Sequence, residues 1–174
     1  MTAEIRLLDA ETAVNAVPGL VTLLEDSVED NASMGFMAPF DAIAAERFWR
    51  ETARGVAAGS HILLIAEDAG QILGTVQIGF AQKPNQPHRG DLMKLIVLRS
   101  ARGRGLARAL MAAAEAESAR LGRFLLVLDT ATGSTAEAIY PGLGWTRVGT
   151  VPDYALYPDG GYCGTTFFYK KLEV

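Results

Sequence analysis

Apolar and polar positions follow a helical period in the first third of the chain and mostly a strand period after it. A helical region begins at Pro18-Gly19, and its apolar positions are Leu20, Val21, Leu23, Leu24 and Val28. A second helix is predicted over Pro39–Ala58, with Phe40, Ile43, Ala44, Phe48 and Val56 at helical spacing and Gly59-Ser60 at its end. Between the two helices, Asn31–Ala38 is a loop that is unusually apolar for a connection.

Strand-like runs occupy most of the remaining chain. The predicted strands are Glu4–Leu8, His61–Ala66, Ile72–Phe80, Asp91–Leu98, Phe124–Leu128, Trp145–Val151 and Thr165–Lys170. The turn Asp68-Ala69-Gly70 joins the second and third of these strands, and a Pro/Gly/Tyr-rich loop separates the last two. Phe124–Leu128 is continuously apolar, which is typical of a strand buried on both faces.

Two further helices interrupt the strands. Leu106–Leu121 is Ala-rich and stops at Gly122. Ser134-Thr135-Ala136-Glu137 is a capping box and predicts a short helix carrying Tyr140. Because helices gather early and strands late, we expect an α+β (mixed α/β) fold with one sheet, in a single domain over residues 1–174.

Composition excludes several classes of function. A net charge of −4 argues against a general nucleic-acid binder, which would carry a broad basic face. No apolar run reaches the roughly 18 residues of a membrane helix, so we predict no membrane partner. The single cysteine, Cys163, rules out an intrachain disulfide and suits a reducing cytoplasm, where we expect the protein to be. The spacing of Cys, His and Asp predicts no metal site.

The turn between the strand Asp91–Leu98 and the helix at Leu106 carries candidate chemistry. It holds four arginines, Arg99, Arg102, Arg104 and Arg108, in an acidic chain. A strand running through a Gly-rich turn into a helix presents free backbone N–H groups and the positive end of the helix dipole, which together bind phosphate. Glycine keeps side chains from holding the backbone away from the anion.

Three phosphate-binding motifs compete for this turn. A Walker loop would need a Gly-Lys-Ser/Thr ending, which is absent. Gly103 and Gly105 give the first two glycines of a dinucleotide fingerprint, and Asp129 lies near the place of a ribose-binding acid. However, Arg108 stands at the third glycine, and too little chain follows for a second mononucleotide half.

The third motif rests on a family resemblance. Arg102-x-x-Gly105-x-Ala107 resembles the R/Q-x-x-G-x-G/A signature of the GNAT superfamily of N-acetyltransferases, and Tyr140-Pro-Gly-Leu-Gly144-Trp145 resembles its Y-x-x-x-G-F/W motif. The chain looks most like the tabtoxin-resistance-type enzymes, through Ser100–Leu106, Leu128-Asp129-Thr130 and Pro152-Asp153-Tyr154-Ala155. The resemblance implies a single, mostly antiparallel, bulged and splayed sheet of about seven strands, flanked by about four helices. It also implies acetyl-CoA as cosubstrate.

The resemblance implies a role for each candidate residue. The cofactor-binding candidates are Leu95, Ile96, Val97, Arg99, Arg102, Gly103, Arg104, Gly105, Leu106, Ala107, Ser134 and Glu137. The backbone N–H of Ile96 or Val97 is expected to stabilise the thioester oxygen as it gains charge. Tyr140 is the candidate general acid for the leaving thiolate, although Pro141 biases its predecessor away from helical geometry.

The acceptor side is less defined by the sequence. Asp91 and Asp129 are predicted to face one another across the cleft, where a carboxylate can take the amine proton or hold the acceptor ammonium. Met34, Phe36 and Met37 are candidates for an acceptor pocket, or they simply attach the loop to the sheet. Gly133 stands where many relatives carry an asparagine, so we expect that side-chain contact to the cofactor to be missing.

These residues predict acetyl transfer from acetyl-CoA to a primary amine of a small molecule, such as an amino-acid-like toxin or antibiotic or a metabolite. Two alternatives are a catalytically weak acyl-CoA-binding regulatory module of the same fold and a protein N-terminal acetyltransferase. Both a monomer and a homodimer are compatible with the sequence.

Overall fold

The computed structural model describes residues 3–173, in which seven strands form one sheet of order β1-β2-β3-β4-β5-β7-β6. The strands are β1 (Glu4–Leu7), β2 (His61–Asp68), β3 (Gln71–Phe80), β4 (Arg89–Val97), β5 (Leu125–Ala131), β6 (Thr146–Leu156) and β7 (Tyr162–Lys171). The helices are α1 (Ala10–Asn15), α2 (Val17–Glu29), α3 (Ala42–Ala57), α4 (Leu106–Arg120) and α5 (Thr135–Ile139). Only β4 and β5 run parallel; every other pair is antiparallel. The expected mixed α/β class with one mostly antiparallel sheet is confirmed.

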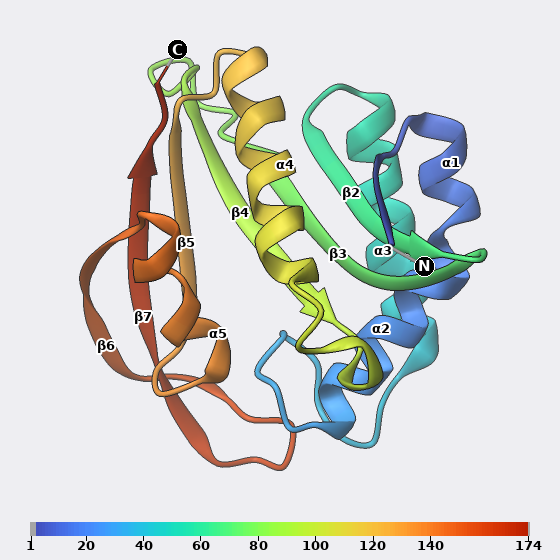
Figure 1. Ribbon diagram of the computed structural model, residues 1–174. Helices are drawn as coiled ribbons and strands as arrows, with labels where there is room; N and C mark the ends of the chain where they lie inside the picture. Colours follow the sequence, from blue (N-terminus) through green and yellow to red (C-terminus); the bar gives the residue numbers. More distant parts are fainter. Residues whose placement is uncertain (1–2, 174) are drawn as a thin grey trace.

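The helices form a layer on each face of the sheet (Figure 1). α4 lies across one face, and α2 and α3 pack on the other against β3 and β2. The core between the layers is apolar, and the fully buried Leu110 of α4, Trp49 of α3 and Leu126 of β5 belong to it. Burial of such side chains is the main favourable term in folding, so the amphipathic faces of the helices determine where each one packs.

The sheet divides between β4 and β5. These strands pair only from Arg89–Asp91 to Leu125–Val127 and then diverge toward the end that carries the start of α4 (Figure 1). β4 also contains a bulge: Thr75 of β3 pairs with Ile96 and Gln77 with Met93, so β4 has one extra residue, and Lys94 has a φ of +53°. The expected bulge and splay are therefore present.

Several predicted elements differ from the observed ones. α3 begins at Ala42 rather than at Pro39, because the Asp41 side chain accepts a hydrogen bond from the N–H of Ala44 and caps the helix there. β5 is buried mainly on one face: Leu126 and Leu128 are buried, whereas Leu125 and Val127 are half-buried. The expectation that Phe124–Leu128 is covered on both faces is therefore wrong, and the next residue, Asp129, is exposed.

The late strands are longer than predicted. β6 and β7 extend through most of the Pro/Gly/Tyr-rich segment, with a register shift between Val151 and Ala155. β6 is at the edge of the sheet, where a proline such as Pro152 is tolerated at a bulge because its missing N–H removes no ladder bond. α1 was not predicted as a separate helix; the Asp9 side chain caps it through a capping box with Thr12.

Candidate functional site

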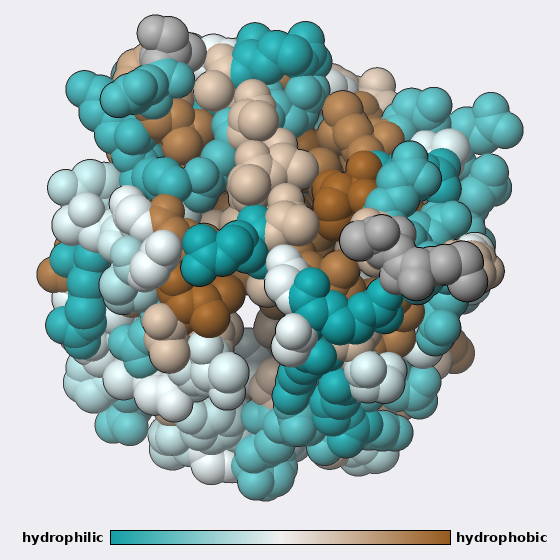
Figure 2. Space-filling model, viewed as in Figure 1, coloured by the Kyte–Doolittle hydropathy of each residue, from teal (hydrophilic) through white to brown (hydrophobic). Residues whose placement is uncertain are grey.

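A cavity of about 650 Å³ lies where β4 and β5 separate. Its walls come from the bulge of β4, the end of β5, the start of α4, α5 and the end of α2. Figure 2 shows the molecule hollowed between the part that carries α5 and the start of α4. The volume is in the range of small-molecule and cofactor sites.

The start of α4 is built to hold an anion. Gly105 is its N-cap residue and supplies no side-chain cap, and the N–H groups of Gly105, Leu106 and Ala107 have no hydrogen-bond acceptor within residues 3–173. Gly103 and Gly105 both have a φ of +77°, in the left-handed region that favours glycine, and a Cβ at either would meet only open space. Gly103, Gly105, Leu106 and Ala107 all line the cavity, so the free N–H groups belong to its wall. Free N–H groups at the positive end of a helix dipole fit the pyrophosphate of coenzyme A.

The four arginines near this turn divide into two groups. Arg102 and Arg108 line the cavity, whereas Arg99 and Arg104 do not. The guanidinium of Arg99 pairs with Asp26 and Glu29 of α2, and its backbone N–H donates to Asp26. These contacts raise the pKa of Arg99, mainly through its hydrogen bond to Asp26. Arg99 therefore attaches the turn to α2, in contrast to its predicted contact with the cofactor.

Arg102 lines the cavity and also forms an ion pair with another element of the protein. Its guanidinium lies 2.6 Å from the carboxylate of Asp30 at the end of α2. α2 carries acidic residues but no basic residue in its last turn, an arrangement its dipole disfavours. Arginines of the turn compensate this negative charge. Arg104 pairs with Asp68 at the end of β2.

Beyond Asp91, the edge of β4 that faces β5 has no strand partner. Leu95, Ile96 and Val97 lie on this open edge and line the cavity. A peptide-like chain, such as the pantetheine arm of coenzyme A, can pair with unpartnered backbone groups of this kind. The bulge at Lys94 changes the direction in which the following backbone groups point.

Tyr140 lies between α5 and the 3₁₀ turn Pro141–Leu143. Its φ of −62° and ψ of −42° are helical, so the expected effect of Pro141 on its backbone is wrong: the 3₁₀ turn that proline begins continues the helical path. The ring packs at centroid distances of 6.1 Å from Trp145 and 5.4 Å from Phe168. Tyr140 is 4% exposed, lines the cavity and makes no hydrogen bond through its hydroxyl within residues 3–173.

The surroundings of Tyr140 keep its phenol protonated. Burial, and next the negative charge of Asp129, raise the pKa of Tyr140 well above its ordinary value of 10.0. Both effects disfavour the phenolate. A neutral phenol with a free hydroxyl, aimed into a cavity, can donate a proton.

The structure brings only one of the two predicted carboxylates into the cavity. Asp129 lines it, and its Oδ2 accepts a hydrogen bond of 2.9 Å from the Thr165 hydroxyl. Asp91 pairs with Arg89 and is in register with Val127, two residues before Asp129, where β4 and β5 still touch. It is not part of the cavity wall. The two aspartates therefore do not face one another across it, because the strands separate only after Asp91.

The three predicted pocket residues also separate. Met34 lines the cavity, whereas Phe36 packs against Phe48 with the ring centroids 5.9 Å apart, and Met37 is 44% exposed. Phe36 and Met37 lie outside the cavity wall. The apolar loop is thus mainly attached to α3, with one residue at the cavity.

Four hydrogen bonds join this loop to the turn between β6 and β7. Asn31 Nδ2 donates to Asp159 Oδ2, and the N–H of Asp159 donates to Asn31 Oδ1. The Ser33 hydroxyl donates to the Leu156 carbonyl, and the N–H of Ala38 donates to the Pro158 carbonyl. The two segments therefore bridge the separated halves of the sheet at one end of the cavity.

Ser134 and Glu137 have different places. The Ser134 hydroxyl accepts from the N–H of Glu137 and caps α5, as predicted, and Ser134 lines the cavity. The Glu137 carboxylate accepts from the N–H of Gly133 and is not part of the cavity wall. Its backbone bond lowers the pKa of Glu137. The geometry gives Glu137 a structural contact rather than a place at the cavity.

Lys94 is a cavity residue that the sequence analysis missed. Its Nζ lies 5.2 Å from the centroid of the Phe48 ring and makes no hydrogen bond or ion pair within residues 3–173. Burial lowers the pKa of Lys94, and the negative charge of Asp129 partly opposes that shift. A cation–π contact contributes about 0.5–2 kcal/mol, less than the several kcal/mol that burying an ion costs. The signal in the sequence was a single charge inside the apolar run Leu92–Leu98.

Two negative findings concern the described part of the chain. In residues 3–173 no group of three or more His, Cys, Asp or Glu side chains is placed to hold a metal ion. No helix over the same residues has the length and apolarity to cross a membrane.

Known proteins share this fold. A putative acetyltransferase from Salmonella typhimurium, solved with its cofactor acetyl-CoA, has a TM-score of 0.80 at 17% identity, covering 100% of this chain and 96% of that one. A phosphinothricin acetyltransferase from Sinorhizobium meliloti, in complex with acetyl-CoA, has a TM-score of 0.79 at 16% identity, covering 99% and 89%. A ribosomal-protein-alanine N-acetyltransferase from Brucella melitensis has a TM-score of 0.77 at 22% identity, covering 97% and 99%.

These similarities establish the fold, and a family comparison adds to them. The sequence matches the model of the acetyltransferase (GNAT) family over residues 22–141. The match spans more than half of the chain, from α2 through β4 and α4 to Tyr140 and Pro141. The chain therefore belongs to the acetyltransferase (GNAT) family.

Proposed function

We propose that this protein is an acetyl-CoA-dependent N-acetyltransferase that acts on a primary amine of a small molecule while both substrates are bound. The observation that carries the proposal is the meeting, in one cavity, of the uncapped start of α4, the open edge of β4 and the free hydroxyl of Tyr140. Bound acetyl-CoA would supply the activated acetyl group as a thioester.

The start of α4 would hold the pyrophosphate. The N–H groups of Gly105, Leu106 and Ala107 are free to donate, and Arg108 adds positive charge at the same wall, whereas the charge of Arg102 is balanced by Asp30. The open edge of β4 would position the rest of the cofactor, and a backbone N–H of Ile96 or Val97 would donate to the carbonyl oxygen as it gains charge. These are contacts of the backbone, so the fold itself supplies them.

Tyr140 would act as the general acid. The phenol is protonated at neutral pH, and because burial raises its pKa further it would give up its proton only to a strong base such as the departing thiolate. Asp129 would hold the ammonium of the acceptor or take its proton, because its Oδ1 has no hydrogen-bond donor in the described chain. Asp91 has no part in this proposal, because its carboxylate pairs with Arg89 away from the cavity.

The closed end of the cavity favours a small acceptor. The hydrogen bonds from Asn31, Ser33 and Ala38 join the loop to the turn between β6 and β7. An extended protein N-terminus would need this end to open, whereas a small amine would not. An amino-acid-like toxin, an antibiotic or a metabolite is compatible with the space.

The test combines binding and turnover. Calorimetry with acetyl-CoA should show binding, and a panel of small primary amines should give release of free thiol. Tight binding with no turnover on any amine would instead identify an acyl-CoA-binding regulatory module. No binding of any acyl-CoA by the folded protein would overturn the proposal.

A glycine variant tests the placement of the pyrophosphate. Gly105→Ala adds a Cβ at the free N–H groups, and the loss of a charge-assisted bond should weaken acetyl-CoA binding by about 1.5–3 kcal/mol, or roughly ten- to a hundredfold in Kd. Gly122→Ala is the matched control, because Gly122 has a φ of +72° and open space at the other end of α4. Equal affinity in the two variants would show that the turn does not hold the pyrophosphate.

A further inference from the structure

The cavity holds a positive charge that the protein leaves without an anionic partner. Lys94 lines the cavity, yet its ammonium makes no hydrogen bond or ion pair within residues 3–173. Its contact is the face of the Phe48 ring, which attracts a cation more weakly than a carboxylate does. Lys94 is half-buried, and a cation that is partly removed from water is normally paired because its desolvation is costly.

The Lys94 side chain reaches toward the loop and helix that precede the sheet. Phe48 belongs to α3, and a Cβ on Gly35 would come within 4.0 Å of the Lys94 Nζ. No hydrogen bond or ion pair within the described residues joins it to the start of α4, where the pyrophosphate is proposed to bind. The ammonium thus lies beside the apolar loop and not at the phosphate turn.

Two aspartates line the same cavity: Asp30 pairs with Arg102, which leaves Asp129 to face a ligand. Asp129 lines the opposite strand, β5, and keeps one carboxylate oxygen without a hydrogen bond. Lys94 and Asp129 influence each other electrostatically but are not within ion-pair distance, since no salt bridge joins them. A ligand that carries both charges would therefore satisfy two groups that the protein itself leaves apart.

We propose that Lys94 binds an anionic group of the acceptor, so that the substrate is an amine that also carries a carboxylate or a similar acid. The inference rests on the proposed N-acetyltransferase function and narrows its substrate class. Asp129 would face the ammonium and Lys94 the acid, and acetyl transfer would leave the acid unchanged.

The arrangement also disfavours a competing class of substrate. A polyamine would place a second positive charge in a cavity that already holds the Lys94 ammonium, and like charges at low solvent exposure repel. Lys94 would thus select for amino acids both by attraction of the acid and by repulsion of a second cation.

The experiment compares amine substrates that differ only in the acid. The probes are glycine, β-alanine and γ-aminobutyrate, each beside its carboxamide, together with L-lysine and its decarboxylated product cadaverine. These probes cover several distances between amine and acid. The measured quantity is kcat/KM from thiol release, for the wild type, Lys94→Met, Lys94→Arg and Lys83→Met, with the acetyl-CoA Kd measured for each protein.

In the wild type, kcat/KM for the best amino acid should be about tenfold or more above that for its carboxamide or diamine partner, mainly because KM is lower. Lys94→Met should bring that ratio close to one, and Lys94→Arg should retain part of it because the charge is kept. Lys83→Met removes an exposed lysine of the loop after β3 and should keep the wild-type ratio.

Four outcomes would overturn the inference. Equal turnover of acids and carboxamides by the wild type would contradict it while leaving the N-acetyltransferase function intact. An unchanged ratio of kcat/KM between acid and carboxamide in Lys94→Met would show that another group binds the acid. A weaker Kd for acetyl-CoA in Lys94→Met, equal for all amines, would place Lys94 in the cofactor site. No turnover of any amine would overturn the proposed function, and with it this inference.

Discussion

At the residue scale, Tyr140 is the side chain whose removal should most affect the chemical step. Tyr140→Phe keeps the ring that packs on Trp145 and Phe168 and removes only the free hydroxyl. Loss of the general acid should lower kcat about a hundredfold, while the Kd for acetyl-CoA should change little. Thiol release gives kcat, and calorimetry gives the Kd.

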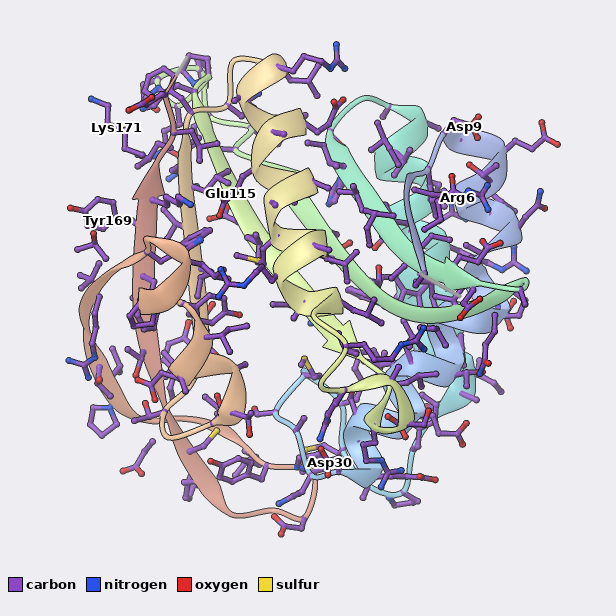
Figure 3. All side chains as sticks on the ribbon, in the orientation of Figure 1. Arg6, Asp9, Asp30, Glu115, Tyr169 and Lys171 are labelled. Atoms are coloured by element: carbon purple, nitrogen blue, oxygen red, sulfur yellow. The ribbon has the colours of Figure 1, made fainter. Side chains whose placement is uncertain are left out.

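The control for this change is Tyr169→Phe. Tyr169 lies on β7, is 40% exposed and is not part of the cavity wall (Figure 3). Its hydroxyl can be removed with no expected effect on kcat. If Tyr140→Phe also turned over at the wild-type rate, Tyr140 would have no role in proton transfer.

The sequence predicts the chemistry of single residues only where the backbone determines their position. Gly103 and Gly105 have the open, left-handed conformation that their motif requires. Arg99 could not be placed from sequence, because its partners Asp26 and Glu29 come from a helix about 70 positions earlier. Asp91 was misplaced for a related reason: its residue type is right for a base, but the point at which β4 and β5 separate is a tertiary property.

At the element scale, Glu115 links α4 to the second half of the sheet (Figure 3). Its carboxylate accepts 2.9 Å from Trp145 Nε1 and 2.6 Å from Lys170 Nζ, and Lys170 also donates to the Leu143 carbonyl. Glu115→Ala would leave two largely buried donors without this acceptor. The free energy of unfolding should fall by about 1–3 kcal/mol, as measured by urea titration.

The matched control lies on the same helix. Glu117 pairs with Arg120 three residues later, and the Arg120 side chain is 66% exposed, so this ion pair is open to solvent. Because exposed ion pairs contribute little, Glu117→Ala should change the unfolding free energy much less than Glu115→Ala. Equal losses for the two variants would mean that the link from α4 to β6 and β7 does not stabilise the fold.

Helices, strands and turns were predicted best where interactions between residues close in sequence determine their bounds. The turn at residues 68–70 and the cap at Ser134 appear as expected, because hydrogen bonds a few residues apart determine them. The late strands were predicted too short, since their length comes from pairing with each other across a bulge near Pro152. The start of α3 was displaced because Asp41 is a stronger N-cap than the proline that precedes it.

At the scale of the whole molecule, the sheet consists of two halves held together by a short parallel contact. β4 and β5 share only three register positions, and the loop at residues 31–38 bridges the halves at the far end. The cavity lies between these two connections. A splay of this kind follows from topology: the bulge in β4 and the parallel neighbour leave an edge that no strand within residues 3–173 covers.

This architecture predicts that the cofactor stabilises the whole fold. A ligand that binds only the native state at 100 times its Kd adds about 2.7 kcal/mol to the unfolding free energy. For a chain of this size each kcal/mol corresponds to about 2–4 °C, so the Tm should rise by roughly 5–11 °C. Thermal unfolding followed by calorimetry, with and without acetyl-CoA, measures the shift. The same ligand-to-Kd ratio in Gly122→Ala should give the same rise, whereas Gly105→Ala at the wild-type ligand concentration should show a smaller one. A Tm that does not respond to acetyl-CoA in the wild type would contradict binding between the two halves.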